Sequence, residues 1–95
     1  MKYKVYLGRR AKKQYKRLND RIQKKIKEEL LELEEEPYKK GFFLSGRYSG
    51  LRYLKISHAG VQYRAVYDMS EEREILVLYL GTRENFYKEL RRYLG

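Results

Sequence analysis

Three apolar segments joined by short turns follow one another in the second half of the chain. They cover residues 51–57, 61–67 and 74–80, and glycine or charged residues fill the turns between them. Consecutive strands with short connections pair as an antiparallel meander. The third segment contains ILVLYL without a polar break, which is typical of a central strand covered on both faces. The meander is therefore predicted to form the centre of a sheet.

The first third of the chain predicts one strand and two helices. Residues 2–7 alternate between lysine and apolar side chains, as a half-buried strand does. Helical spacing follows at residues 9–18 and again from Asn19 or Asp20 to about Glu36. The short break between these helices implies an antiparallel helical hairpin. The second helix should bury a stripe formed by Ile22, Ile26, Leu30 and Leu33, with Leu31 beside it.

Residues 38–50 form the only long loop, and a last helix from Arg83 or Glu84 to Leu94 closes the chain. The expected anchors of the loop in the core are Phe42, Phe43 and Leu44. The buried face of the last helix should hold Phe86, Leu90 and Leu94. The order strand, helix, helix, three strands, helix predicts one α+β domain over residues 1–95. Its sheet should be four-stranded and mostly antiparallel, with the helical hairpin on one face.

The net charge of +10 indicates a polyanionic partner such as nucleic acid. Basic side chains dominate the first helix and continue onto the second. The candidate RNA- or ribosome-binding residues there are Arg9, Arg10, Lys12, Lys13, Lys16, Arg17 and Lys24. A solvated helix face is an equally good explanation of this stripe.

The composition argues against several kinds of site. The chain has no cysteine and one histidine, so neither disulfides nor a metal centre is expected. It has no glycine-rich phosphate loop, and its acidic residues gather on the second helix and the turn at residues 68–73. No apolar run approaches the roughly 18 residues of a membrane span, and no signal peptide is visible. We therefore expect a cytoplasmic protein without a cofactor.

Three basic residues and a phenol accompany the meander. Lys55 lies in its first strand, Arg64 in its second, and Arg83 follows its third; Tyr87 shares a helical face with Arg83 if a helix begins there. Metal-free RNA cleavage uses the ribose 2′-OH as nucleophile and needs a base, an acid and positive charge at the phosphorane oxygens. Arginines clamp phosphate, and nearby cations lower the pKa of a lysine or tyrosine. The competing interpretation is that the arginines are structural ion-pair partners.

A set of short motifs in a fixed order resembles the RelE branch of the RelE/ParE toxin superfamily. The motifs are Leu44-Ser45-Gly46, Leu54-Lys55-Ile56, Tyr63-Arg64-Ala65-Val66-Tyr67 and Gly81-Thr82-Arg83 through Tyr87. The resemblance implies a RelE-like fold over nearly the whole chain. It also implies an mRNA interferase, a metal-independent endoribonuclease that cuts mRNA in the ribosomal A site and inhibits translation.

The resemblance assigns a role to each of the four residues. Arg64 and Arg83 would stabilise the transition-state phosphate, Tyr87 would stack on or orient the cut nucleotide, and Lys55 is a candidate base. The family has two basic residues on the strand of Lys55, and this sequence departs from that pattern. Tyr53 stands at the alternate position, and Arg52 should point to the opposite face; both are kept as candidate RNA-binding residues.

The resemblance also implies two partners, the ribosome with mRNA in its A site and a cognate RelB-like antitoxin. We expect the antitoxin to cover exposed apolar and basic surface of the sheet or the last helix, through an amphipathic helix. Two alternatives share much of this sequence pattern. One is a ParE-like toxin that binds gyrase without nuclease chemistry, and the other is a small basic RNA-binding protein.

Overall fold

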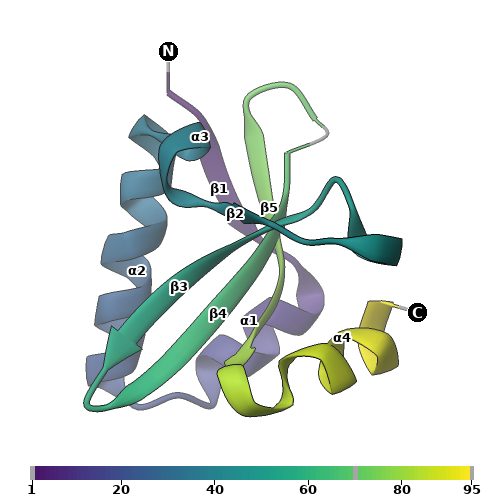
Figure 1. Ribbon diagram of the computed structural model, residues 1–95. Helices are drawn as coiled ribbons and strands as arrows, with labels where there is room; N and C mark the ends of the chain where they lie inside the picture. Colours follow the sequence, from purple (N-terminus) through teal and green to yellow (C-terminus); the bar gives the residue numbers. More distant parts are fainter. Residues whose placement is uncertain (1, 70, 95) are drawn as a thin grey trace.

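A five-stranded sheet lies between a helical hairpin and a single C-terminal helix in the computed structural model, which describes residues 2–69 and 71–94 (Figure 1). The spatial order of the strands is β1-β5-β4-β3-β2. Their bounds are β1 Lys4–Leu7, β2 Phe42–Phe43, β3 Arg52–His58, β4 Val61–Asp68 and β5 Glu74–Thr82. Strands β2 to β5 pair antiparallel, and β1 joins β5 in parallel. The prediction of an α+β fold with a mostly antiparallel sheet is confirmed, with β2 as an additional strand.

The helical hairpin consists of α1 (Arg9–Lys16) and α2 (Asp20–Glu35). The Asn19 side chain caps α2, because its Oδ1 accepts a hydrogen bond of 3.0 Å from the amide of Ile22. The predicted stripe of Ile22, Ile26, Leu30 and Leu33 is buried against residues of β5 such as Ile75 and Val77. This confirms the packing of the hairpin on one face. Leu31 lies outside the stripe and is exposed.

The segment between α2 and β3 is more regular than a loop. It contains the short helix α3 (Pro37–Lys40), the edge strand β2 and the 3-10 turn η1 (Gly46–Tyr48). The prediction that both phenylalanines anchor it is wrong, since Phe42 is 47% and Phe43 67% exposed. Leu44 is buried as expected, and Tyr48 is the second anchor. The two phenylalanines are consecutive in an edge strand, so they point to opposite faces of the sheet, and both remain exposed.

Strand β5 is not covered uniformly. Val66 pairs with Tyr79 whereas Tyr67 pairs with Val77, so Leu78 is an extra residue in a β-bulge. The bulge reverses the alternation of side chains. Val77 and Leu80 therefore join the core beneath the hairpin, and Tyr79 joins the core on the opposite face. Leu76 is 39% exposed, so the expectation of cover on both faces along the whole strand is wrong there.

The last helix, α4 (Phe86–Leu94), follows a 3-10 turn, η2 (Arg83–Asn85). The α-helix therefore begins later than the sequence predicted. Phe86 and Leu90 are buried as predicted, whereas the side chain of Leu94 lies outside the described part of the chain. Phe86 and Leu90 form a second core on the α4 side of the sheet, together with Leu44, Tyr48, Val66 and Tyr79. Among the helices of residues 2–69 and 71–94, none is long and apolar enough to cross a membrane.

Candidate functional site

Strand alternation places two cations next to each other on the α4 side of the sheet. Leu54 and Ile56 are buried beneath the hairpin, so Lys55 between them points to the opposite face. Ala65 of β4 is buried beneath the hairpin in the same way, and its neighbour Arg64 also points to the α4 side. Lys55 and Arg64 are direct cross-strand partners in the pairing of β3 with β4. We call these two residues the cation pair.

An aromatic row of four side chains runs from β2 and β3 to α4 beside the cation pair. Phe42 stacks on Tyr53 with the ring centroids 5.5 Å apart and the planes at 26°. The centroids of Tyr53 and Phe86 lie 5.4 Å apart, and those of Phe86 and Tyr87 5.0 Å apart. The middle of the row is covered, since Phe86 is buried, whereas its two ends are open, with Phe42 47% and Tyr87 51% exposed.

The cation pair rests on this aromatic row. Lys55 Nζ lies 4.5 Å from the centroid of the Phe42 ring. The guanidinium carbon of Arg64 lies 4.8 Å from the Tyr53 centroid and 4.7 Å from that of Phe86. Arg64 Nε also donates a hydrogen bond of 3.3 Å to Oε1 of Gln62. Among the described residues neither cation has a salt bridge to a carboxylate, so their charge remains available to an anion.

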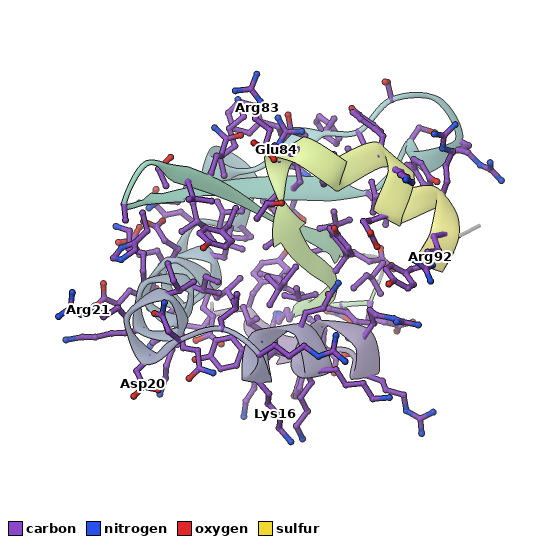
Figure 2. All side chains as sticks on the ribbon, turned by 90° about the horizontal axis from the view of Figure 1, so that it is seen from below. Lys16, Asp20, Arg21, Arg83, Glu84 and Arg92 are labelled. Atoms are coloured by element: carbon purple, nitrogen blue, oxygen red, sulfur yellow. The ribbon has the colours of Figure 1, made fainter. Side chains whose placement is uncertain are left out.

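Arg83 reaches the same side of the molecule from the end of β5. Figure 2 shows it beside Glu84 on the α4 side of the sheet. It lines an open hollow together with Gln62, the residue that holds Arg64. No salt bridge joins Arg83 to Glu84 within the described part of the chain, so the geometry gives no support to a structural ion pair there. Because α4 begins only at Phe86, the four-residue spacing does not put Arg83 and Tyr87 on one α-helical face, although both are exposed.

Gly81 leaves space for the Tyr79 ring on the α4 side of the sheet. Gly81 is the cross-strand partner of Arg64 in the pairing of β4 with β5. A Cβ atom at Gly81 would collide with the Tyr79 ring, which lies across it. Burial, helped by the nearby carboxylate of Glu89, raises the pKa of Tyr79 to about 12. The Tyr79 hydroxyl therefore stays protonated at neutral pH and is not a candidate base.

The basic residues of the helical hairpin form a separate surface. Figure 2 shows Lys16 and Arg21 on the side of the sheet opposite Arg83. The exposed members of this surface among the sequence-predicted residues are Arg9, Arg10, Lys12, Lys13, Lys16, Arg17 and Lys24. Arg10 has an intramolecular role as well, because its guanidinium carbon lies 3.8 Å from the centroid of the Tyr93 ring of α4. Lys16 and Arg21 thus lie on the opposite side of the sheet from Arg83, whereas Arg10 reaches α4.

Arg52 and Tyr53 lie on opposite faces of β3, as predicted. Tyr53 belongs to the aromatic row next to Lys55. The guanidinium carbon of Arg52 instead lies 4.1 Å from the Phe43 centroid and 5.1 Å from that of Tyr38. Arg52 is therefore not a second basic residue beside Lys55.

Sequence reasoning missed Phe42 and Gln62 as parts of this site. The pairing of Phe42 with Tyr53 creates the open end of the aromatic row, and a two-residue strand carries no periodic signal of its own. Gln62 was not singled out, although its i, i+2 relation to Arg64 on a strand puts both side chains on one face. No three His, Cys, Asp or Glu side chains gather into a metal-binding group in residues 2–69 and 71–94.

Comparison with known proteins identifies the class of protein. Residues 5–91 match the model of the ParE-like toxin family of type II bacterial toxin-antitoxin systems. The chain therefore belongs to the ParE-like toxins, and within the RelE/ParE superfamily its fold is RelE-like. No curated protein gives a significant match.

Solved structures of RelE-type toxins have the same fold. A double arginine-to-alanine mutant of E. coli toxin RelE in the free state is 24% identical, with a TM-score of 0.77 over 98% of this chain and 94% of that one. The intact E. coli RelBE toxin-antitoxin complex contains a chain that is 27% identical, with a TM-score of 0.69 over 86% and 98%. The RelBE2 toxin-antitoxin complex from Mycobacterium tuberculosis gives 24% identity and a TM-score of 0.72 over 87% and 100%.

Proposed function

We propose that this toxin is a ribosome-dependent mRNA endoribonuclease, which cuts mRNA in the A site and thereby inhibits translation. The observation that carries the proposal is the cation pair. Like charges directly opposite each other in a sheet are unfavourable, and no carboxylate among the described residues compensates them. An anion with two or more oxygens would satisfy both, and the phosphodiester of RNA is such a group.

The proposed reaction needs no metal ion. The ribose 2′-OH loses its proton to a base and attacks the adjacent phosphorus, and the bond from phosphorus to the 5′-oxygen breaks. The products are a 2′,3′-cyclic phosphate and a 5′-hydroxyl, which takes up one proton. Arg64 and Arg83 stabilise the negative charge that develops on the phosphorane oxygens. Lys55 is the candidate base, a role that requires its uncharged amine, and Tyr87 orients the nucleotide at the cut.

The geometry supports these roles in three ways. Arg64 is held by Gln62 and by two aromatic rings, so its guanidinium is preorganised. Arg83 follows the end of β5 directly and is exposed without a salt bridge within the described residues. Tyr87 is half exposed at one end of the aromatic row, where a base can reach its ring.

Two partners follow from the proposed function. We propose a RelB-like antitoxin that binds exposed apolar and basic surface, since two of the similar solved structures are toxin-antitoxin complexes. We also propose that the exposed cations of the hairpin, such as Lys12, Lys13 and Lys16, contact ribosomal phosphates in the cytoplasm. Because they lie on the face opposite the cation pair, the protein could contact the ribosome and the mRNA at the same time.

The second candidate is a ParE-like toxin that binds gyrase without cutting RNA, and residues 5–91 match the ParE-like toxin model. Primer extension on translated mRNA after induction of the protein separates the two functions. The endoribonuclease produces new 5′ ends within translated codons, and these ends disappear when translation is blocked beforehand. Intact mRNA together with inhibited DNA supercoiling would instead establish gyrase binding.

A further inference from the structure

Phe42 occupies the end of the aromatic row that lies farthest from Tyr87. Strand pairing with Tyr53 places its ring on the α4 side of the sheet, and the two rings stack at a centroid distance of 5.5 Å. Almost half of the side chain remains exposed. The Phe42 ring thus packs against Tyr53, and its exposed part is accessible to a flat ligand such as a nucleobase.

In the free protein Lys55 covers part of the Phe42 ring, with its Nζ 4.5 Å from the centroid. A cation–π contact at an exposed site is weak, and a charge-assisted hydrogen bond to phosphate is stronger. A bound phosphodiester would therefore draw the ammonium group away from the ring. The same movement would expose the ring face beside the phosphate, where a neighbouring nucleobase lies.

We propose that Phe42 is a nucleobase-stacking residue of the RNA site. It forms a second stacking position beside Tyr87, so that the site takes single-stranded RNA with one base on each end of the aromatic row and the phosphate between them on the cation pair. This inference rests on the proposed function for its ligand. Every unpaired base can stack on an aromatic side chain, whereas a base inside a duplex cannot, because its faces are already stacked on neighbouring bases.

The adjacent residue provides a matched control. Phe43 is more exposed than Phe42, at 67%, and belongs to the same strand. It pairs with Arg52 and points to the other face, where the Arg52 guanidinium lies 4.1 Å from its centroid. A general loss of exposed aromatic surface would affect both positions equally, whereas stacking at the RNA site requires only Phe42.

The test is the affinity of the free protein for a fluorescein-labelled, fully 2′-O-methylated single-stranded oligonucleotide, which cannot be cut. Phe42→Leu should weaken binding about tenfold, whereas Phe43→Leu should stay within about twofold of the unmodified protein. Phe42→Tyr, which keeps the ring, should bind like the unmodified protein. Binding of the corresponding duplex should be the same for all of these proteins.

The proposal is overturned if the unmodified protein does not bind the single strand, or if Phe42→Leu and Phe43→Leu weaken binding equally. It is also overturned if Phe42→Tyr loses as much affinity as Phe42→Leu. Since the oligonucleotide cannot be cut, the result does not depend on catalysis. The proposed function is tested separately by primer extension. If it fails, the mRNA stays intact in translating cells, while Phe42→Leu still weakens binding of the oligonucleotide.

Discussion

Lys55 and Arg64 face each other directly across β3 and β4, and aromatic rings rather than carboxylates surround both of them in the described structure. The cation–π contacts hold both side chains in place, but an aromatic ring neutralises a positive charge less completely than a carboxylate does. Local arrangements that reduce stability are expected where a protein binds or reacts. The pair therefore links the sheet geometry to the proposed chemistry.

Removing one member of the cation pair should separate stability from activity. Lys55→Met keeps the length of the side chain and removes the repulsion, so the free energy of unfolding should be unchanged or higher by up to about 1 kcal/mol. RNA cleavage should fall if Lys55 is the base. Urea unfolding of this variant, with Lys88→Met as the surface control, measures the first effect. A clear loss of stability would mean that the contact of Lys55 with Phe42 outweighs the repulsion.

The hairpin cations should set the salt dependence of ribosome binding. Replacing Lys12, Lys13 and Lys16 by glutamine removes three exposed charges and should reduce the slope of log affinity against log salt by about 2. Arg10 is left unchanged because it also packs on Tyr93. The measurement is ribosome binding at several salt concentrations. An unchanged slope would identify the stripe as a solvated helix face.

Gly81→Ala should destabilise the fold. The added methyl group meets the ring of Tyr79, which is buried and has little room to move, so we expect a loss of about 1–3 kcal/mol. Thermal unfolding measures the effect. The double variant Gly81→Ala/Tyr79→Ala tests the cause, because removal of the ring should make the alanine at position 81 nearly neutral. If Gly81→Ala lowers the free energy of unfolding equally in the Tyr79→Ala background, the cause is backbone strain and not a collision with the ring.

Alkaline pH should unfold the protein partly through Tyr79. Its pKa is about 12 in the folded protein against 10.0 as the ordinary value, so the folded state favours the protonated hydroxyl. The corresponding stability is present below pH 10 and is lost as the pH rises toward 12. Tyr79→Phe should therefore lose less stability than the unmodified protein between pH 9 and about 11.5. The measurement is the free energy of unfolding from denaturant at several pH values. An equal loss of stability with pH in both proteins would contradict this prediction.

Much of the fold follows from patterns that are local in the sequence. The spacing of Ile22, Ile26, Leu30 and Leu33 predicts the buried face of α2, and the meander predicts β3, β4 and β5. Strand alternation also separates Tyr53 from Arg52 correctly. These predictions succeed because helical and strand periodicities determine which side chains share a face.

The remaining features depend on which segments pair in space. The two residues of β2 are too few for a periodic signal, so the sequence does not predict their addition to the sheet edge. The bulge at Leu78 depends on the register between β4 and β5, and an uninterrupted apolar run gives no sign of it. The aromatic row joins Phe42, Tyr53 and Phe86 from three elements far apart in the chain, so only tertiary structure brings it together.

If the cations on the α4 side act in RNA cleavage, their removal should slow the reaction without unfolding the protein. The most direct test is single-turnover cleavage of mRNA in the A site of programmed ribosomes by Arg83→Ala and Arg64→Ala, together with the melting temperature of each variant. Arg91→Ala, which removes another exposed arginine, is the control. Loss of one preorganised contact to the transition state should lower the rate about a hundredfold, or about 3 kcal/mol, with melting temperatures and antitoxin binding near normal. A variant with a lower melting temperature whose folded fraction cuts RNA at the normal rate would contradict a catalytic role of that arginine.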